Sequence, residues 1–457
     1  MKNNYITETV ERQRRFFKSG KTMKISFRKE MLMKLKTALK ENETAILKGL
    51  NADLNKSGTE AYMTEIGIVL EELNYHIKHI HSWAKPKRVH TPVAHFPSKS
   101  VIYPKPYGVA LIISPWNYPL NLSLLPLIAA ISAGCTAVLK PSEYAPNTSG
   151  VLKNLLSSVF DPDFITVIEC SGNENKKLSE ENFDYIFFTG SKEVGREIMK
   201  KAAENLTPVT LELGGKSPCI ISSSADVKLA AKRICFGKTL NSGQTCVAPD
   251  YVLIDGKLKE EFIDAYRNSL NIFFPNGNYS DMCSIINKKH FHRALGLLSS
   301  GAIRLGGGFD EDRLMIEPTI LDDVGMDSPV MTEEIFAPIL PVLTYNSINT
   351  AIDFINDNPS PLALYYFGKD KYERENVINS CRFGGCCIND TVIHITNPRL
   401  PFGGIGESGI GAYHGKTGFD TFSHYTSIVK HSLHPDLSIR YRPYTNFKKK
   451  IIRCLMK

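Results

Sequence analysis

Several features are missing from this sequence, and each absence narrows the class of protein. No stretch reaches the roughly 18 consecutive apolar residues that a membrane-spanning helix needs. Residues 1–21, MKNNYITETVERQRRFFKSGK, lack the apolar core of a secretory signal peptide. We therefore expect a cytoplasmic protein.

The ten cysteines form neither a disulfide framework nor a metal site. They are scattered through the chain, and no two of them make a C-x-x-C pair, the spacing typical of zinc and redox sites. Most are expected to be small buried hydrophobic residues. We predict no bound metal.

The excess of positive charge does not indicate a nucleic-acid partner. Against 47 Asp and Glu there are 55 Lys and Arg, and the basic residues crowd the two ends of the chain. Nucleic-acid binding would need aromatic or zinc-ligand modules interleaved with a basic stripe, and we find no such module in the sequence. We expect a solvated basic face and no nucleic-acid partner.

What the chain does have is an α/β pattern long enough for more than one domain. Its 457 residues fit about two or three domains at about 150 residues each. Apolar residues at intervals of three and four predict packed helices from Phe27 to Trp83, and the proline-punctuated stretch 87–107 predicts a pair of extended strands. Strand-like runs then alternate with helical patterns in two successive series. This order predicts two tandem α/β domains with parallel sheets covered on both faces.

The stretch YIFFTGSKEVGREI predicts a nucleotide site. An apolar strand ends at Gly190, and Ser191 and Gly195 follow at the start of a helix. Glycine allows close approach of the backbone, and a helix N-terminus offers free N–H groups to a phosphate. The spacing is G-x-x-x-x-G rather than G-x-G-x-x-G, so an ordinary strand-to-helix turn is the alternative.

Two more strands end in polar residues, where ligands gather beyond the carboxyl ends of parallel strands. In VLKPSE, Glu143 can accept both ribose hydroxyls of an adenosine and Lys140 can reach the same sugar; solvated loop charges are the alternative. In ISPWNYP, the amide of Asn117 is a candidate oxyanion donor, with an Asx turn as the alternative.

A base and a nucleophile complete the set. In LELGGKSP, Glu212 ends a strand, where partly apolar surroundings would raise its pKa into the range of a general base. In GQTCVAPDY, Cys246 is the candidate nucleophile, in a turn whose own N–H can face a developing oxyanion. Together with the nucleotide turn, these residues indicate a cofactor-dependent enzyme.

Seven motifs resemble those of the aldehyde dehydrogenase superfamily, in the family's order and over nearly the whole chain: SPWNYP, LKPSE, FTGSKEVG, LELGGKSP, GQTCVAPDY, EEIFAP and LPFGGIGESG. Within the family, GQTCVAPDY, INKKHF and PFGGIGESGIGAYHGKTGFDTFSH look most like the class 3 branch, which handles fatty and aromatic aldehydes. The resemblance implies NAD(P)-dependent oxidation of a medium- or long-chain aliphatic or aromatic aldehyde to the carboxylic acid, through a cysteine thiohemiacetal and a thioester.

The resemblance also implies a role for each residue. Cys246 would be the nucleophile, Glu212 the general base, and Asn117 with the Cys246 N–H the oxyanion hole. Glu334 of EEIF would hold the nicotinamide ribose and is a competing candidate for the base. The other implied contacts are Trp116, Phe336, Lys140, Glu143, Gly190, Ser191 and Gly195 with the cofactor, and Tyr118 and Phe402 with the aldehyde tunnel. For Phe336 and Phe402, simple core packing is the alternative.

The family's fold implies three units and a tail. These are a Rossmann-like NAD-binding domain over 1–86 and 106–211, a catalytic domain over 212–394, and a bridging β element over 87–105 and 395–430 that builds a homodimer. The remaining tail, 431–457, carries seven Lys or Arg from Arg440 onward and no acid. We expect either a solvated helix end packed against its own subunit or a weak, salt-sensitive contact with a membrane surface.

Cofactor choice and reaction type leave alternatives. Glu143 on the ribose would repel a 2′-phosphate and favour NAD, whereas Lys192 beside the cofactor loop is compatible with NADP. A coenzyme-A-acylating dehydrogenase is a second reading, against which the base Glu212 argues. The nucleotide motifs argue against a non-redox cysteine hydrolase, and the intact Cys246, Glu212 and Asn117 argue against a catalytically silent homologue.

Overall fold

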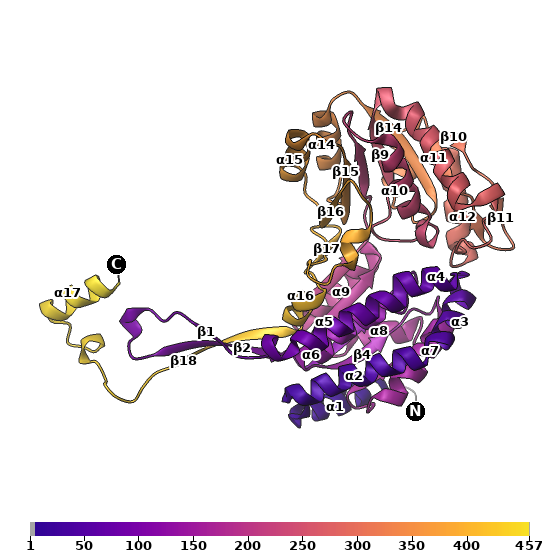
Figure 1. The fold of residues 1–457 in the computed structure, drawn as a ribbon. Helices are drawn as coiled ribbons and strands as arrows, with labels where there is room; N and C mark the ends of the chain where they lie inside the picture. The colour runs from indigo at the N-terminus through magenta and orange to yellow at the C-terminus, as the bar shows by residue number, and fades with distance from the viewer. Residues whose placement is uncertain (1–4, 457) are drawn as a thin grey trace.

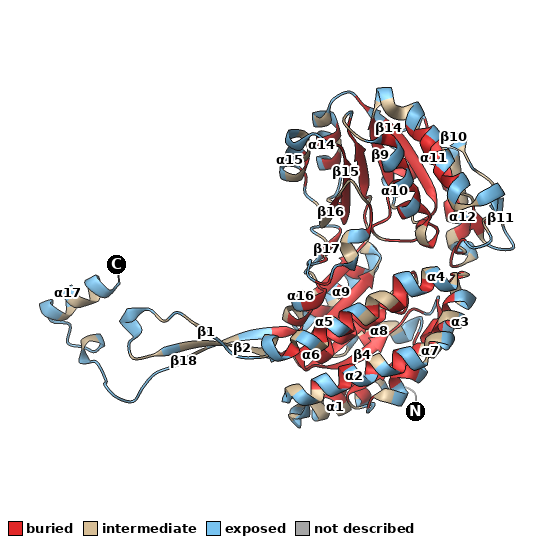
Figure 2. Cartoon of the chain, in the orientation of Figure 1, coloured by how far each residue is buried: buried red, intermediate tan, exposed pale blue. Residues whose placement is uncertain are grey.

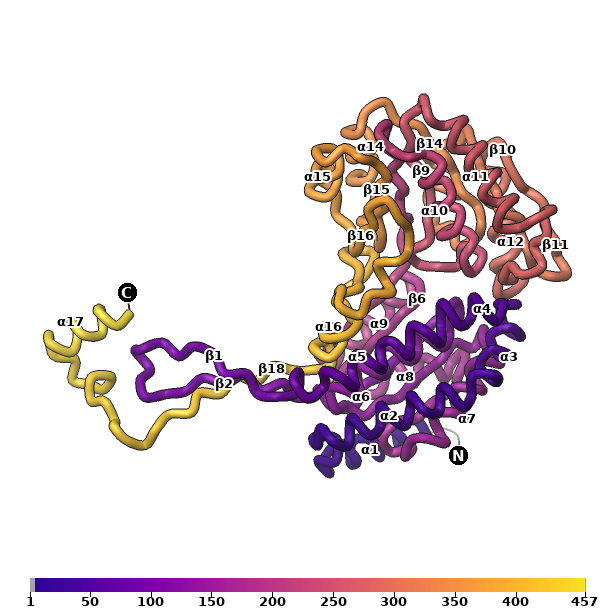
Figure 3. Tube along the Cα trace, in the orientation of Figure 1, coloured from indigo at the N-terminus to yellow at the C-terminus, as the bar shows by residue number. Residues whose placement is uncertain are grey.

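The computed structural model describes residues 5–456 and shows two α/β lobes and a long, thin arm (Figure 1). Residues 1–4 and 457, at the ends of the predicted NAD-binding domain and tail, lie outside the described residues. The chain begins in the first lobe, runs out along the arm and back, builds most of the first lobe and then the second, returns to the first lobe over residues 409–421, and leaves along the arm again (Figure 3). The first lobe and the arm are therefore assembled from segments that lie far apart in the sequence.

The first lobe is built on a six-stranded sheet in the order β17-β7-β6-β3-β4-β5. β3 to β7 are parallel, and their order is that of a Rossmann sheet, which confirms the predicted Rossmann-like fold. β17 joins the edge antiparallel to β7. The strands are β3 (Val109–Ile113), β4 (Thr136–Lys140), β5 (Ile165–Val167), β6 (Tyr185–Gly190), β7 (Val209–Leu213) and β17 (Gly409–Ile410).

Helices cover both faces of this sheet because successive strand residues point in opposite directions. Ala110 and Ile112 pack toward α6, whose sequence NLSLLPLIAAISA is apolar on nearly every side and is accordingly buried. Val109 and Leu111 pack toward α1 and α9. The helices of this lobe are α1 (Tyr5–Lys18), α2 (Ile25–Glu41), α3 (Glu43–Leu54), α4 (Gly58–Ala61), α5 (Gly67–Trp83), α6 (Asn121–Ala133), α7 (Pro146–Val159), α8 (Asn173–Glu180), α9 (Lys192–Glu204) and α16 (Gly415–Thr421).

The second lobe has a seven-stranded sheet in the order β10-β13-β14-β9-β8-β15-β16, in which β10 is the antiparallel strand. Val252 faces α10 and α11, and the next residue, Leu253, faces α12, α14 and α15. The strands are β8 (Pro218–Ile221), β9 (Tyr251–Asp255), β10 (Ala302–Leu305), β13 (Thr319–Asp322), β14 (Ile339–Tyr345), β15 (Ala363–Phe367) and β16 (Gly385–Ile388), with a separate pair β11 (Phe309–Asp310) and β12 (Met315–Ile316). The helices are α10 (Val227–Thr239), α11 (Lys259–Phe273), α12 (Lys288–Leu297), α13 (Pro329–Thr332), α14 (Ile348–Asn356) and α15 (Lys371–Ser380).

The arm is a three-stranded antiparallel sheet in the order β1-β2-β18. β1 (Lys87–Val89) and β2 (Lys99–Pro106) are the extended pair predicted over 87–107, and β2 pairs along its full length with β18 (Ser423–Lys430). Figure 2 shows burial concentrated in the two sheets, whereas the arm is largely exposed or half-buried. Within the described chain, the outer edge of β18 has no partner strand.

One part of the predicted bridging range lies elsewhere. β17 and α16 fall within 395–430, but β17 pairs with β7, and α16 packs on α5 and α6 of the first lobe. The reason is the glycine-rich backbone: a Cβ on Gly409 would lie 2.4 Å from the Leu211 carbonyl oxygen, so only glycine allows this strand to approach β7. Of that range, β18 is the strand that belongs to the arm. The functional role assigned to each range stays a prediction.

Candidate active site

A cavity of about 730 Å³ opens between the two lobes and is lined by residues of both. Nine of the predicted site residues line it: Trp116, Asn117, Gly190, Ser191, Glu212, Cys246, Glu334, Phe336 and Phe402. They are spread from position 116 to position 402, so their convergence is a property of the tertiary fold.

The cavity begins where the first sheet reverses its strand order. β3 and β6 are neighbours, but the chain continues from β3 toward β4 on one side and from β6 toward β7 on the other, which leaves a crevice at their carboxyl ends. Trp116 follows β3 there, and Ser191 follows β6. Ser191 caps α9, because its Oγ accepts the Val194 N–H at 3.4 Å. Donors in the first turn of such a helix are suited to an anion.

Cys246 follows a backbone run of unusual conformation. Asn241, Ser242 and Gly243 all adopt positive φ, at 50°, 53° and 73°. A Cβ on Gly243 would lie 2.4 Å from the Ala337 carbonyl oxygen, so this turn requires glycine. Non-glycine residues in this region persist only where their surroundings hold them. Here the run places Cys246, half-buried, on the cavity wall.

The surroundings of the Cys246 thiol favour its protonated form. Burial raises the pKa of the thiol, and the carboxylates of Glu334 and Glu212 raise it further. The backbone N–H groups of Cys246 itself and of Val247 act in the opposite direction. The thiol therefore needs a base in order to ionise, and its neighbouring N–H groups are placed to stabilise negative charge.

Glu212 has the properties of that base. It lies in β7 opposite Gly409, is only 3% exposed, and neither of its carboxylate oxygens has a hydrogen-bond partner among the described residues. Burial raises the pKa of Glu212 well above its usual range. An unpartnered carboxylate with a raised pKa is suited to accept a proton.

Asn117 is tied to the loop that carries the nucleophile. Its Nδ2 donates to the Gln244 carbonyl at 3.0 Å, and its own carbonyl accepts a hydrogen bond from Asn241 Nδ2 at 2.9 Å. Gln244 lies two residues before Cys246, so these bonds hold the amide close to the sulfur's loop. An amide NH₂ group has two donor hydrogens, and the second is available to a ligand in the cavity.

Glu334 faces the loop that follows Glu212. The Gly215 N–H donates to its carboxylate, and burial raises the pKa of Glu334 to about 8. Its Oε1 has no partner among the described residues, and the same is true of the Thr189 Oγ1, on another residue that lines the cavity. Two such polar atoms in one cavity fit a ligand that brings its own hydroxyl groups, such as the ribose of a nicotinamide cofactor.

Charged residues that the sequence analysis did not single out hold the EEIF segment against this loop. Lys216 pairs with Asp250 and donates to the Glu333 carbonyl at 2.9 Å. Asp250 accepts the Ile335 N–H at 3.1 Å, and Arg293 donates to the Ile335 carbonyl at 2.6 Å. These side chains act on backbone far away in the chain, so no local pattern marks them.

Aromatic side chains form part of the cavity wall. Trp116 and Phe336 pack edge to face, with ring centroids 5.4 Å apart, and Phe402 packs in the same way on Tyr413 at 5.8 Å. Phe336 has a φ of 49°, which is uncommon for a bulky residue. All four line the cavity, which suits an apolar or planar ligand.

Three predicted cofactor residues are not among the described residues that line the cavity. Lys140 and Glu143 face each other at 3.9 Å at the end of β4, one strand away from the crevice, and Glu143 also accepts a hydrogen bond from Asn175 Nδ2 at 3.2 Å. Gly195 lies in the first turn of α9, on its buried face, where a Cβ would meet the Leu213 side chain at 2.7 Å. Its structural role is the close packing of helix on sheet.

Tyr118 also differs from its expected place in the aldehyde tunnel. The ring is buried, its hydroxyl is hydrogen-bonded to Thr245 Oγ1 at 2.6 Å, and it is not one of the described lining residues. Burial raises the pKa of Tyr118 well above its usual value. The residue therefore supports the cavity wall from behind.

Comparison with known proteins agrees with this geometry. The aldehyde dehydrogenase family model matches residues 1–428. The chain is 48% identical to 4,4'-diaponeurosporen-aldehyde dehydrogenase of Staphylococcus aureus over 99% of this chain and 100% of that protein. It is 43% identical to aldehyde dehydrogenase family 3 member B1 of Bos taurus over 96% and 95% of the two chains. A solved structure, the substrate-bound state of Staphylococcus aureus AldH, superposes with a TM-score of 0.97 at 48% identity and covers 99% of each chain. The chain therefore belongs to the aldehyde dehydrogenase family, in its class 3-like branch, and is an NAD(P)-dependent oxidoreductase that acts on aldehydes.

Proposed function

We propose that the chain oxidises a medium- or long-chain aliphatic or an aromatic aldehyde to its carboxylic acid, with Cys246 as the nucleophile. The observation that carries this proposal is the convergence of Cys246, Glu212 and Asn117 on one cavity whose wall is partly aromatic. The Staphylococcus aureus relative is named for diaponeurosporen aldehyde, and we include that aldehyde in the proposed substrate range.

The first half of the reaction forms a bond to sulfur. Glu212 takes the thiol proton, the Cys246 sulfur adds to the aldehyde carbon, and the C=O electron pair moves onto oxygen. Asn117 Nδ2 and the Cys246 N–H stabilise that oxyanion. A bound nicotinamide cofactor supplies the acceptor for the hydride that leaves the same carbon. A thioester then remains on Cys246.

The second half releases the acid. Glu212 first passes the thiol proton to solvent. It then takes a proton from water, the water oxygen attacks the thioester carbon, the C–S bond breaks, and the departing thiolate takes that proton back from Glu212. Glu334 is the competing base, but the Gly215 N–H already engages its carboxylate. This contact supports a role for Glu334 on the cofactor ribose.

Membership in an oxidoreductase family excludes the non-redox hydrolase that the sequence analysis left open. In the coenzyme-A-acylating alternative, the thioester passes to a thiol instead of water. Both oxygens of Glu212 lack partners within the described chain, and this supports water as the acceptor, because a free base is what hydrolysis needs.

We propose that the first lobe binds the cofactor, that the second carries the nucleophile, and that NAD is preferred. Lys192, which could attract a 2′-phosphate, is paired with Glu407 at 3.2 Å. This pairing offsets its charge. The carboxylate of Glu143 at the end of β4 also supports NAD, because it would repel the 2′-phosphate of NADP.

We propose a homodimer built through the arm. The outer edge of β18 has no partner strand within the described chain, and Val429 and Leu433 beside it are 63% and 88% exposed. An exposed edge with apolar side chains is a template for pairing with another chain. Analytical ultracentrifugation is expected to show a dimer, and a monomer at micromolar concentration would contradict the proposal.

We propose a weak, salt-sensitive membrane contact for the tail. Within residues 5–456, no helix is both long and apolar enough to cross a membrane. α17 (Asn446–Leu455) lies far from both lobes, near the tip of the arm (Figure 1), instead of packing on the body of its subunit. Its exposed Phe447 accompanies a run of lysines over 448–450. Near an anionic surface, each basic residue contributes about 1 kcal/mol.

Co-sedimentation with anionic vesicles tests the tail. The full chain is expected to bind at low salt and a chain ending at Tyr444 is not. Equal binding by both forms would assign α17 a structural role, and a loss of dimer instead of vesicle binding would place it on the partner subunit.

The central assignment is tested by Cys246→Ala. This variant is expected to lose aldehyde oxidation and to bind NAD as the wild type does, because the sulfur supplies the covalent step and not cofactor affinity. Cys454→Ala, in the exposed tail, is the control. Stopped-flow NADH formation with and without coenzyme A, across short, long-chain and aromatic aldehydes, gives the reaction type and the substrate range. Turnover of Cys246→Ala within roughly tenfold of wild type would refute the nucleophile.

A further inference from the structure

We propose that a buried ion pair, Lys56–Glu65, positions the oxyanion hole of the reaction; the inference rests on the proposed function. The Lys56 Nζ and Glu65 Oε1 lie 2.9 Å apart, and both side chains are 0% exposed. Lys56 is in the connection between α3 and α4, and Glu65 is in the π-helical turn η2 (Tyr62–Ile66). Neither is one of the described residues that line the cavity.

Stability alone does not account for such a pair. Removing two charges from water costs several kcal/mol per ion, and an apolar pair of the same shape is often as stable or more so. π-helical turns are themselves rare and occur frequently at functional sites. The contacts of Lys56 and Glu65 indicate why the buried pair is present.

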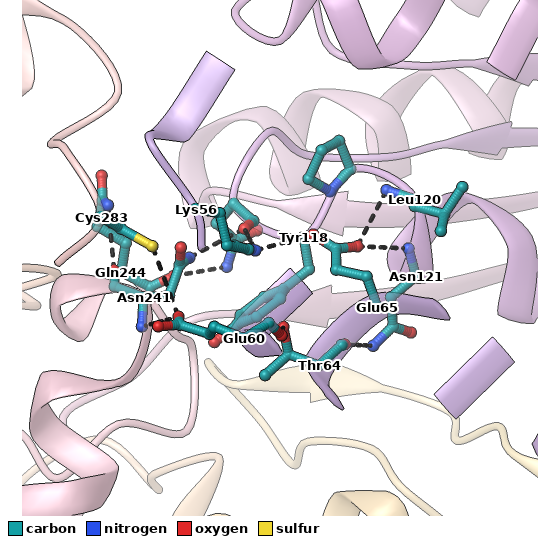
Figure 4. Close-up of polar contacts among 12 residues, drawn as sticks. Lys56, Glu60, Thr64, Glu65, Tyr118, Leu120, Asn121, Asn241, Gln244 and Cys283 are labelled. Atoms are coloured by element: carbon teal, nitrogen blue, oxygen red, sulfur yellow. Dashed lines mark hydrogen bonds and ion pairs between the residues drawn. The ribbon is translucent and has the colours of Figure 1, made fainter. Parts of the chain in front are cut away.

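Glu65 fixes the segment that follows Asn117. Its Oε2 accepts the N–H groups of Leu120 and Asn121 at 3.1 and 2.8 Å, and Asn121 Nδ2 donates to the Thr64 carbonyl at 3.0 Å. Figure 4 shows these groups pointing toward one another. The carboxylate thereby holds the start of α6, and with it the loop between β3 and α6.

Lys56 fixes Asn117 itself. Its ammonium donates to the Asn117 carbonyl at 3.3 Å and lies 4.3 Å from the centre of the Tyr118 ring. The Tyr118 hydroxyl reaches Thr245, the residue before Cys246. The Lys56 ammonium therefore contacts Asn117 directly. Through the Tyr118 ring it also contacts the loop that carries Cys246.

Glu60, on α4 of the same segment, holds the other loop. Its Oε1 accepts the Asn241 N–H at 2.7 Å, and Asn241 Nδ2 donates to both the Asn117 and the Gln244 carbonyls, at 2.9 and 3.0 Å. Asn241 is one of the residues with positive φ before Cys246, so Glu60 helps to hold that strained run (Figure 4). Residues 56–65 thus determine where the two proposed oxyanion donors lie relative to each other.

The expected effect is on rate and not on affinity. Loss of one oxyanion donor costs about 10² to 10³ in kcat, and a displacement of about 1 Å costs up to about 10². The double variant Lys56→Met/Glu65→Gln removes both charges and keeps approximate shape. It should fold and bind NAD as the wild type does, while single-turnover NADH formation slows about 10- to 100-fold and a primary isotope effect from aldehyde deuterium increases.

A matched control is Lys259→Met/Asp322→Asn, an ion pair of the second lobe whose residues are not among the described lining residues. It should leave the single-turnover rate unchanged. Should Lys56→Met/Glu65→Gln fail to fold, Glu60→Ala tests the same positioning of the loops, because Glu60 is less buried than the ion pair and holds Asn241. It should slow NADH formation, and Glu60→Gln, which keeps an oxygen acceptor, should restore the rate.

The variant Asn117→Ala distinguishes a failure of the proposed oxyanion hole from a failure of the positioning inference. If Asn117→Ala leaves the single-turnover rate unchanged, the proposed oxyanion hole is wrong. If Asn117→Ala slows that rate but neither Lys56→Met/Glu65→Gln nor Glu60→Ala does, the positioning inference is wrong. The same holds if the control pair slows it equally. Support requires slow NADH formation, unchanged NAD binding, and little further loss when the changes are combined with Asn117→Ala.

Discussion

Replacing Gly214 by alanine is expected to move the Glu334 carboxylate without unfolding the protein. Gly214 is not one of the glycines with positive φ, so alanine adds no backbone strain. Its Cβ would lie 1.9 Å from Glu334 Oε2. Carbon and oxygen atoms that are not bonded approach to about 3.3 Å, so the carboxylate must retreat by about 1.4 Å. Because it ends a flexible side chain, the retreat is inexpensive, and the melting temperature should change by only a few degrees.

The loss should fall on the cofactor. A hydrogen bond lengthened by about 1.4 Å is no longer one, and hydrogen bonds to charged groups contribute about 1.5–3 kcal/mol. At about 1.4 kcal/mol for each factor of ten, the dissociation constant of NAD should rise about 10- to 100-fold. Isothermal titration calorimetry with NAD measures this above the Glu334 pKa of about 8, where the side chain is the charged carboxylate, and differential scanning fluorimetry follows stability.

A control and a double-mutant cycle sharpen the test. Gly150→Ala, inside α7, places its Cβ in open space and should leave NAD affinity unchanged with equal or higher stability. In a Glu334→Ala background, Gly214→Ala should have little further effect, because the group that it displaces is gone. An equal loss of NAD affinity in both backgrounds, or a collapse of stability, would refute the reasoning.

Three further results are expected. Glu212→Gln should slow thioester hydrolysis more than thioester formation, so that a pre-steady-state burst of NADH appears or grows; the same hydrolysis defect in Glu334→Gln, and not in Glu212→Gln, would reverse the two roles. Glu143→Gln should narrow the preference for NAD over NADP, and an unchanged ratio of kcat/KM values for the two cofactors would show that this carboxylate does not read the ribose. Burial raises the pKa of Glu334 from 4.5 to about 8, so the folded state holds a proton that the unfolded state releases, and wild-type stability falls as pH rises between these values. Glu334→Gln should therefore gain in melting temperature relative to wild type as pH rises from about pH 5 to about pH 8; a constant difference over this range would contradict this.

Local sequence was sufficient to predict the helices and strands and to indicate candidate residues for the chemistry. The apolar run NLSLLPLIAAISA is buried as α6 because almost every side of that helix is hydrophobic, and YIFFTGSKEVG becomes a strand, a cap and a helix start because each step has its own local signal. The sequence indicates Cys246, Glu212 and Asn117 because each residue type, at the end of a strand or in a turn, carries a specific chemistry. The Rossmann-like order of the sheet and the family membership confirm the predicted fold class and family, and the roles of the three residues stay predictions.

Tertiary structure alone decided which of these residues meet and what holds them. Tyr118 follows Asn117 directly, yet it lies behind the cavity wall, because neighbouring residues of a loop need not face the same side. β17 lies within the predicted bridging range but pairs with β7 beside Glu212. Lys56 and Glu65 have no catalytic motif, and Glu60 reaches Asn241 across 181 positions of the chain. Such contacts depend on how whole helices and strands pack. The packing energy is a sum over many residues that lie far apart in the sequence, so a short sequence pattern does not reveal it.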